Sequence, residues 1–273
     1  MTASACEVVL SEQEFRLYQS LFSDKLGIHL PDQKLTLVGT RLWKRLRARG
    51  ISSYTDYYHL INQPDQQEEL CHALELITTN ETYFFREPRH FDFLKQTVLP
   101  DLKGQDVVRV WSAACSSGEE LFSIAMVLAD QRIGKWELLG SDINQTMLEK
   151  ARKAIYLDQR TEHMPVEYRH RFCRRGTGPH QGSLRIEPGL RSRIKLQNIE
   201  LHQPLPDVGT FDVVFLRNVM IYFDNGTRQK VVRQIVDRIQ AGGYLFVGHS
   251  ESLRGVCPEL LQVQPAIYQV KKQ

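Results

Sequence analysis

A regular alternation of short apolar runs with helical segments after residue 105 constrains the fold more than any other feature of the sequence. The first run, at 107–113, is followed by a helical segment at 119–130. The same pattern continues with strands expected at 137–141, 194–196, 212–216 and 244–248, and helices expected at 145–154 and 228–240. Strands that alternate with helices build a mostly parallel sheet covered by helices on both faces. We therefore predict an α/β fold for this part of the chain.

Two segments depart from this alternation. The last two apolar runs, at 261–263 and 266–270, are separated by Gln264-Pro265, a spacing that suits a hairpin. We expect them to form an antiparallel edge of the sheet. Residues at about 160–191 are rich in Arg, Gly, Pro and His, with alternating polar and apolar side chains near 183–186. This pattern predicts a small antiparallel β insert.

The first 78 residues show helical periodicity and no strand-like alternation. Ser11 and Glu14 have the spacing of a capping box at the start of a helix. A second helix, from about residue 31, carries one apolar stripe formed by Leu35, Val38, Leu42 and Leu46. We predict an all-helical N-terminal domain at 1–78, a linker at 79–92, and a second domain at 93–273 that contains the β insert.

The composition is typical of a globular protein in a reducing compartment. Of the 273 residues, 42% are hydrophobic and 25% charged, and no apolar run approaches the roughly 18 residues of a membrane span. The first fifteen residues contain three Glu and no Lys or Arg, unlike a secretory signal. The five cysteines form no C-x-x-C pair and the nine histidines show no zinc-type spacing, so we expect neither disulfides nor a metal. A net charge of +3 does not by itself indicate nucleic-acid binding.

The segment at 107–120 has the pattern of a strand, a tight turn and a helix start that together bind a ligand. The turn consists of small residues and ends at Gly118. In open α/β sheets, ligands bind at the carboxyl ends of the strands, where small residues let backbone N–H groups approach them. Asp142 ends the next strand, where its carboxylate could accept both hydroxyls of a ribose. We interpret Cys115 as a small turn residue rather than an activated thiol.

Two kinds of adenosine cofactor compete for this turn. A nicotinamide or flavin cofactor needs a G-x-G-x-x-G pattern for its pyrophosphate, and only Gly118 is present. Glu119 and Glu120 would place negative charge against that pyrophosphate. The same acids suit a cationic ligand without phosphate, such as S-adenosylmethionine, which carries a sulfonium and an ammonium group. The competing interpretation is that both are first-turn acids that favour the helix dipole.

Arg86 is a candidate active-site residue outside the turn. It follows three consecutive aromatic residues in the segment at 79–87. A guanidinium beside aromatic rings needs a carboxylate partner or a substrate. Glu81 and Glu87 offer the alternative of an internal ion pair.

Tyr222 is the second candidate. It lies in the segment at 217–223, which follows the strand expected at 212–216. The carboxyl ends of parallel strands meet at one edge of the sheet, so Tyr222 belongs to the same edge as Asp142. Its hydroxyl could touch the reacting centre there, or its ring could be a half-buried packing residue.

At these residues the sequence closely resembles the CheR family of chemotaxis receptor methyltransferases, which are S-adenosylmethionine-dependent protein-glutamate O-methyltransferases. The matching strings span nearly the whole chain in the family's order: Asn80–Glu87, Arg109–Glu120, Gly140–Asn144, Ala151–Tyr156, Phe211–Asp224 and Gly242–Leu253. The resemblance implies a class I, Rossmann-like methyltransferase sheet after the helical domain, with the linker contributing to the cofactor site. The sequence departs from the family pattern at Leu121 and Phe122, where Pro and Tyr are usual.

The resemblance also implies roles for individual residues. Arg86 and Tyr222 would act beside the accepting carboxylate. The cofactor contacts would come from Asn80, Thr82, Arg86, Glu119, Asp142, Asn198, Ile199, Arg217 and Asn218. The cofactor would be S-adenosyl-L-methionine and the product S-adenosyl-L-homocysteine. The reaction would form glutamate methyl esters on chemoreceptor cytoplasmic domains for chemosensory adaptation.

Two basic regions are candidates for receptor docking. Lys34, Arg41 and Arg45 lie beside the apolar stripe of their helix, and the substrate that the family implies is an acidic helical bundle. Nucleic-acid binding and a merely solvated face are the alternatives. The insert resembles the family subset that docks a C-terminal tether peptide of the receptor, which implies roles for Arg174, Arg175, Gly176 and Gly178. A purely structural hairpin is the alternative there.

We therefore expect a monomeric cytoplasmic enzyme that is recruited to receptor arrays, with no nucleic-acid partner and no segment inserted into the membrane. Two other functions remain open from the sequence. A methyltransferase acting on RNA or a small metabolite would keep the same cofactor turn. A non-catalytic module would bind the cofactor without transfer, although the presence of both Arg86 and Tyr222 argues against it.

Overall fold

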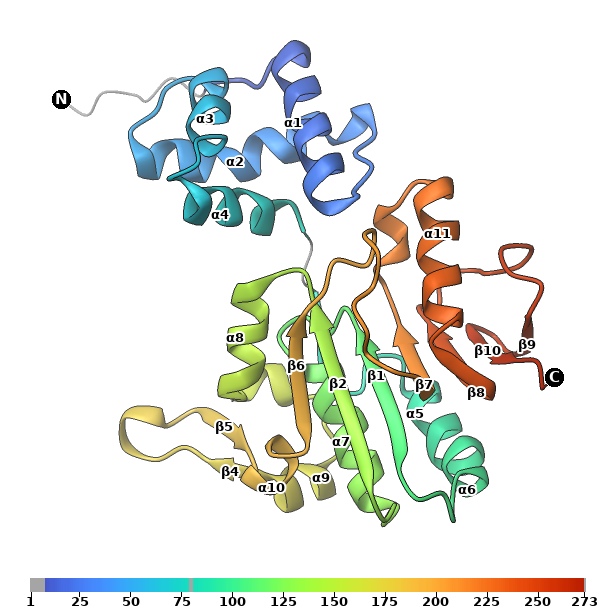
Figure 1. Ribbon diagram of the computed structural model, residues 1–273. Coiled ribbons are helices and arrows are strands. Elements are labelled where there is room, and N and C mark those ends of the chain that lie inside the picture. The colour runs from blue at the N-terminus through green and yellow to red at the C-terminus, as the bar shows by residue number, and fades with distance from the viewer. Residues whose placement is uncertain (1–7, 79–80, 273) are drawn as a thin grey trace. The chain divides into compact units, whose positions relative to one another are not determined.

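The computed structural model describes residues 8–78 and 81–272 (Figure 1). The chain divides into two compact units. The first comprises the chain up to residue 79 together with Tyr222–Asp224, and the second comprises 80–221 and 225–273.

The first unit is helical, as the sequence predicts. Its elements are α1 (Glu12–Leu26), the 3-10 turn η1 (Asp32–Lys34), α2 (Leu35–Arg49), α3 (Tyr54–Ile61) and α4 (Gln67–Ile77). The capping box of α1 is confirmed: the Glu14 N–H donates to Ser11 Oγ (3.3 Å) and the Ser11 N–H donates to Glu14 Oε2 (3.0 Å). Along the predicted stripe of α2, Val38, Leu42 and Leu46 are buried, and Leu35 is half-buried at the start of the helix.

The second unit contains a seven-stranded sheet in the order β6-β2-β1-β7-β8-β10-β9. The parallel strands are β1 (Val108–Ala113), β2 (Trp136–Asp142), β6 (Ile194–Asn198), β7 (Phe211–Leu216) and β8 (Ile239–Val247). The expected terminal hairpin is confirmed, because β9 (Leu260–Gln264) pairs antiparallel with β10 (Ile267–Val270), which in turn pairs antiparallel with β8. The α/β fold that the alternation predicts is therefore present, with the Rossmann-like sheet that the resemblance implies.

Helices lie on both faces of this sheet (Figure 1). One face shares a core with α5 (Pro88–Phe93), the π-helical turn η2 (Leu94–Val98), α6 (Leu99–Asp101) and α7 (Glu119–Asp130). The same face carries α8 (Gln145–Lys153), whose Leu148 belongs to this core and which packs beside β2 and β6. On the opposite face lies α11 (Asn225–Val236), which packs against β8. Gly140 lets α7 lie close to β2, since a Cβ at that position would approach the Leu121 side chain to 2.7 Å.

The insert is a three-stranded antiparallel sheet in the order β3-β5-β4. Its elements are β3 (Ile155–Leu157), η3 (Asp158–Thr161), α9 (Val166–Phe172), β4 (Cys173–Arg175), η4 (Gly178–His180) and β5 (Ser183–Ile186), and α10 (Pro188–Arg191) follows them. The small sheet thus begins at Ile155, before the predicted start near residue 160. The reason is local: Ala154 ends α8 in the left-handed conformation (φ 52°), and the chain enters β3 directly.

The topology creates a switch point at the carboxyl end of the central strand β1. Strand β1 lies between β2 and β7. The chain leaves β1 for β2 on one side and returns through β6 to β7 on the other side. The two connections part at the carboxyl end of β1, which is where open α/β sheets bind ligands.

Candidate cofactor and active site

The turn between β1 and α7 has an unusual backbone that is fixed by neighbouring strands. Ala114 (φ 92°) and Ser116 (φ 48°) adopt positive φ, as does Gly118 (φ 94°). A Cβ at Gly118 would lie 3.0 Å from both Ala151 Cβ and the Tyr156 hydroxyl oxygen, so only glycine fits without displacement. Strain of this kind in non-glycine residues is found at functional sites, where the surrounding structure maintains it.

Hydrogen bonds occupy most of the backbone N–H groups of this turn. The N–H groups of Ala114 and Cys115 both donate to the Ser141 carbonyl at 2.8 Å. The Ser116 N–H donates to Asp142 Oδ2 (2.8 Å), and the Gly118 N–H donates to the Cys115 carbonyl (3.0 Å). Pyrophosphate binding at a helix start depends on free N–H groups. The turn itself therefore has few N–H groups left for a diphosphate, in keeping with the missing G-x-G-x-x-G pattern.

Asp142 ends strand β2, beside the turn that follows β1. Its side chain is buried, with Oδ2 bound to the Ser116 N–H and Oδ1 bound to the Asn144 N–H (2.9 Å). Burial raises the pKa of the Asp142 carboxyl, and the hydrogen bonds from the backbone of Asn144 and Ser116 partly offset that rise. Each carboxylate oxygen can accept a second hydrogen bond. The arrangement is thus compatible with an acceptor for ligand hydroxyl groups.

Asn198 and Ile199 lie next to Asp142, as a shared site requires. The Asn198 side-chain amide donates to the carbonyls of Asp142 (2.9 Å) and Ile143 (2.8 Å). The Ile199 N–H donates to the Asp142 carbonyl (3.2 Å). The end of β6 is thereby tied to the end of β2, and three of the residues expected to contact the cofactor come together.

Glu119 has partners that the sequence did not reveal. It is fully buried, and its carboxylate accepts hydrogen bonds from Ser117 Oγ (2.6 Å) and from Arg160 Nε (2.8 Å). Arg160 also donates to the carbonyl of Thr82 (3.1 Å), another expected cofactor contact. Arg160 comes from the insert, 41 residues after Glu119. No local pattern could have found this pair.

Arg217 binds Glu120, the second acidic residue in the first turn of α7, and connects three segments of the chain. Its guanidinium donates through Nη1 to Glu120 Oε2 (2.8 Å) and through Nη2 to the Arg86 carbonyl (2.6 Å), and Nη2 lies 2.9 Å from Glu87 Oε2. The side chain is 1% exposed. Arg217 is therefore a buried bridge between α7, the segment before α5 and the end of β7.

Arg86 lies in a segment held in an uncommon conformation. Its neighbours Phe85 (φ 56°) and Glu87 (φ 58°) both have positive φ. Arg86 Nη1 donates to the Glu81 backbone carbonyl (2.6 Å), whereas the Glu87 carboxylate pairs with Arg217. The expected alternative, an ion pair between Arg86 and the carboxylate of Glu81 or Glu87, is thus not found among the described residues.

Three potential metal ligands also meet here, which the sequence did not predict. One ligand atom each from Glu87, His90 and His249 lies within 4.8 Å of the others. His90 is 1% exposed, and its burial lowers the pKa of its imidazole to about 3. However, Glu87 Oε2 already has Arg217 Nη2 as its counter-ion at 2.9 Å. We assign the cluster to the ion-pair network and not to a metal.

The remaining expected active-site residues are placed as follows. Asn80 lies outside the described residues. Asn218 follows β7 at positive φ (57°). Tyr222 ends the 3-10 turn η5 (Met220–Tyr222) and groups with the first compact unit. Leu121 and Phe122, where the sequence departs from the family pattern, are both buried in the core of the second unit.

The three basic residues expected to dock the receptor in the helical unit differ in exposure and in their hydrogen-bond partners. Lys34 is exposed. Arg41 Nη1 donates to the carbonyls of Leu76 (3.0 Å) and Ile77 (3.1 Å) at the end of α4. Arg45 donates to both carboxylate oxygens of buried Glu69 (2.8 and 2.6 Å). Two of the three expected docking residues thus hold their own unit together.

In the insert, β4 is an edge strand that carries Arg174 and Arg175. Arg174 Nε donates to Glu187 Oε1 (2.9 Å), and Arg175 is exposed. A Cβ at Gly176 would collide with the His180 carbonyl oxygen, and Gly178 has a positive φ (58°). The glycines therefore shape a tight loop beside a free strand edge.

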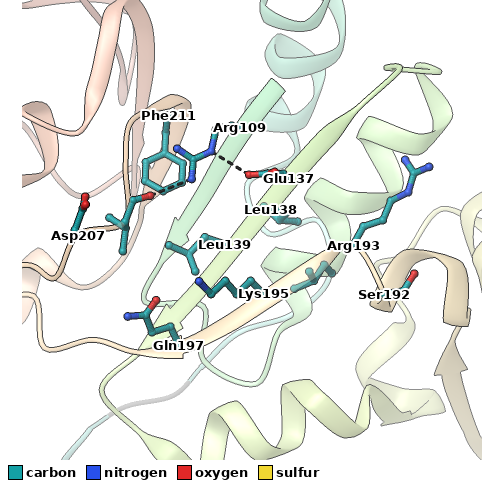
Figure 2. Close-up of a pocket in the computed structure, with 12 residues that line it drawn as sticks. Arg109, Glu137, Leu138, Leu139, Ser192, Arg193, Lys195, Gln197, Asp207 and Phe211 are labelled. Atoms are coloured by element: carbon teal, nitrogen blue, oxygen red, sulfur yellow. Dashed lines mark hydrogen bonds and ion pairs between the residues drawn. The ribbon is translucent and has the colours of Figure 1, made fainter. Parts of the chain in front are cut away.

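A separate cavity of about 410 Å³ lies over the amino-terminal parts of β1, β2, β6 and β7 (Figure 2). Figure 2 shows Arg109 beside Glu137, to which its Nε donates at 3.1 Å. Its Nη1 and Nη2 donate to the carbonyls of Thr210 (2.7 Å) and Val208 (3.0 Å). Arg109 thus anchors the β6–β7 connection, residues 199–210, which contains no helix. The cavity lies at the opposite end of the strands from the turn.

Comparison with known proteins agrees with this geometry. The family model described as the CheR methyltransferase SAM-binding domain matches residues 80–267, and that of the CheR all-alpha domain matches residues 13–78. The chain is 38% identical to the chemotaxis protein methyltransferase of Escherichia coli K12, covering 90% of this chain and 86% of that protein. It is 36% identical to the Salmonella typhimurium chemotaxis protein methyltransferase (97% and 92% covered) and to chemotaxis protein methyltransferase 2 of Pseudomonas aeruginosa (92% and 93%). This chain therefore belongs to the CheR family of chemotaxis methyltransferases, with an all-helical domain followed by a domain that binds S-adenosylmethionine.

Proposed function

We propose that this enzyme transfers the methyl group of S-adenosylmethionine to glutamate side chains of chemoreceptor cytoplasmic domains. The products are glutamate methyl esters and S-adenosyl-L-homocysteine, the reaction of a protein-glutamate O-methyltransferase. The observation that carries the proposal is the turn at 114–118: four of its five N–H groups are hydrogen-bonded, and buried Asp142 and Glu119 flank it. Such a turn suits an adenosyl cation and opposes a diphosphate.

Unpartnered polar atoms at the turn fit a bound cofactor. Ser116 Oγ and Asn144 Nδ2 are buried and have no hydrogen-bond partner among the described residues. Buried polar groups rarely lack partners, so a ligand with hydroxyl and amino groups is a natural complement. The cofactor contacts that we propose are Asn80, Thr82, Arg86, Glu119, Asp142, Asn198, Ile199, Arg217 and Asn218. When bound, S-adenosylmethionine supplies an electrophilic methyl group.

The enzyme needs no general base for this reaction. A glutamate carboxyl group has a pKa of about 4.3 and is ionised at neutral pH. The protein must instead orient the carboxylate oxygen in line with the methyl carbon and exclude water. We propose that the Arg86 guanidinium and the Tyr222 hydroxyl provide this orientation. Arg86 uses one of its five N–H donors for the Glu81 carbonyl, and the others can bind a carboxylate.

We propose the receptor's acidic helical bundle as the macromolecular substrate. The basic surface of α2 would attract it by long-range electrostatics, through exposed Lys34 and the half-buried Arg41 and Arg45. The free edge of β4, with Arg174 and Arg175, would add the receptor's tether peptide as an extra strand around the loop at Gly176 and Gly178. We accordingly place a monomeric enzyme in the cytoplasm at receptor arrays. In the described residues, no helix is long and apolar enough to span a membrane.

The test is transfer of labelled methyl from S-adenosylmethionine to purified receptor cytoplasmic fragments. Methyl esters release methanol in mild base, whereas N-methyl products formed on RNA or an amine survive. We expect base-labile label on the fragment, and none on a matched fragment whose candidate Glu residues are changed to Gln. Base-stable label, or label on RNA alone, would contradict the proposal. Cofactor binding without any transfer would indicate a non-catalytic module.

A further inference from the structure

A single carboxylate holds the loop that follows β7. Glu251 is 7% exposed and lies beyond the end of β8. Its Oε2 accepts the N–H groups of Asn218 (2.8 Å) and Gly248 (2.7 Å), and its Oε1 accepts the N–H of Met220 (2.8 Å). The Ile221 backbone also donates to this carboxylate. One carboxylate therefore accepts the backbone hydrogen bonds of three residues in the loop at 218–221.

The conformation of the loop is held by this anchor. Asn218 adopts positive φ (57°), which asparagine tolerates better than other non-glycine residues, and the hydrogen bond to Glu251 selects this conformation. Its N–H is directed at Glu251. Asn218 follows Arg217 and precedes η5, so its conformation sets the direction in which the chain leaves the sheet edge.

Gly248 is the second part of the same arrangement. A Cβ at Gly248 would collide with the Asn218 side-chain amide nitrogen and lie 2.9 Å from Glu251 Oε2. Because glycine has no side chain, the Asn218 amide can pack against the backbone of Gly248. The Glu251 N–H donates back to the Gly248 carbonyl (2.8 Å), which closes a turn between the two residues. Gly248 and Glu251 together define the place of Asn218.

We propose that Glu251 is a positioning residue for cofactor binding, which acts by fixing Asn218 through the backbone and has no contact with the cofactor itself. This inference rests on the proposed function, because it takes Asn218 as a cofactor contact. A carboxylate is required because both of its oxygens only accept hydrogen bonds. An amide at this position would direct its NH2 group at the N–H groups of either Met220 or Asn218 and Gly248.

The test uses the full-length enzyme with two independent variants, Glu251→Gln and Gly248→Ala. We expect each to raise the Kd for S-adenosyl-L-homocysteine and the KM for S-adenosylmethionine about tenfold, because buried N–H groups lose their acceptor or Asn218 is displaced. The KM for the receptor fragment should stay within about twofold. A variant that is merely less stable would lose active enzyme and lower the maximal rate, without this selective change in KM.

Asp130→Asn is the matched control. Asp130 is a partly buried carboxylate at the far end of α7 that accepts hydrogen bonds from Lys95, Tyr168 and Arg171. We expect it to lower the melting temperature and to leave the cofactor Kd unchanged. Unchanged cofactor affinity in both Glu251→Gln and Gly248→Ala would overturn the inference, as would an equal loss in Asp130→Asn. Wild-type enzyme that fails to bind the cofactor would instead overturn the proposed function, so the two failures are distinct.

Discussion

Two buried carboxylates, Glu69 in the helical unit and Asp142 at the sheet edge, are held in opposite ways. In the helical unit, Glu69 binds Arg45 through both oxygens and also accepts the Tyr57 hydroxyl (2.7 Å). The hydrogen bond from Arg45 holds the pKa of the Glu69 carboxyl below its ordinary value. The negative charge is thus matched by a cation inside the same unit, and the pair stabilises the fold of that unit.

At the sheet edge, Asp142 is held only by backbone N–H groups. No Lys or Arg pairs with it among the described residues, and burial raises the pKa of its carboxyl group. Backbone donors fix the position of the carboxylate without neutralising it. The difference separates a carboxylate that stabilises a fold from one that is positioned for a ligand.

The largest effect expected from this comparison is that of Asp142→Asn. The new amide would direct its NH2 group at the N–H of either Ser116 or Asn144 and would disturb the strained turn. We expect the affinity for S-adenosyl-L-homocysteine, measured by calorimetry, to fall about a hundredfold, since buried donors lose a charged acceptor. Glu69→Gln is the matched control and should bind the cofactor normally. Binding of Asp142→Asn within threefold of wild type would remove Asp142 from the cofactor site.

The next effect concerns the accepting carboxylate rather than the cofactor. We expect Arg86→Ala to lower kcat/KM for methyl transfer about a hundredfold, because a misplaced nucleophile loses in-line alignment. Tyr222→Phe removes one hydrogen bond and should cost about tenfold. Arg86→Lys, which keeps the charge but loses the planar fork, separates charge from geometry. Normal turnover in both Arg86→Ala and Tyr222→Phe would contradict the assignment.

In the helical unit the corresponding change affects stability and not binding. Glu69→Gln leaves the Arg45 guanidinium without its counter-ion, and we expect it to lower the free energy of unfolding by about 2 kcal/mol at pH 7. Because the folded-state pKa of Glu69 is lowered, its stabilisation is present at neutral pH and is lost as pH falls through that lowered value. Urea unfolding at pH 7 and pH 4 should therefore show a smaller difference between variant and wild type at pH 4.

The control for this measurement is the adjacent residue. The Glu68 side chain is 95% exposed, so Glu68→Gln should leave the free energy of unfolding nearly unchanged at both pH values. An equal loss in the two variants would mean that the Arg45–Glu69 pair contributes nothing beyond general charge.

The sequence predicted those parts of the fold that periodicity encodes. The helix at 119–130, the terminal hairpin and the turn at Gly118 were all readable, because each has a local pattern. Strand β3 was missed because it has three residues, and Ile155 and Leu157 are exposed, so it resembles a loop. Local pattern thus predicts the longer elements but misses a short strand with exposed apolar residues.

The pairings at the site could not be predicted in the same way. Arg160 meets Glu119, Arg217 meets Glu87, and Glu251 meets Asn218 across 41, 130 and 33 residues of the chain. Such contacts follow from the sheet order, which brings the carboxyl ends of β1, β7 and β8 together. The expected docking residue Arg45 was read as free for the same reason, since its partner lies 24 residues away on another helix.

The smallest expected effect concerns receptor docking, and the structure changes how it must be tested. Charge reversal at Arg41 or Arg45 would disrupt contacts inside the helical unit, so loss of receptor binding would not report on docking. Lys34 and Lys44 are both exposed. We expect Lys34→Glu combined with Lys44→Glu to weaken binding of the receptor fragment about fivefold at low salt, and less at high salt, because screening removes long-range attraction.

A double variant with the same change in net charge provides the control. Lys103 and Lys135 are exposed residues of the second unit, outside α2. If docking depends on the α2 surface, Lys103→Glu combined with Lys135→Glu should retain most of the affinity at every salt concentration. If both double variants lose affinity equally, the attraction comes from the overall charge of the protein, and α2 has no special part in receptor recognition. Calorimetric titration with the cofactor should give wild-type affinity in both, because none of the four lysines is among the residues expected to contact the cofactor.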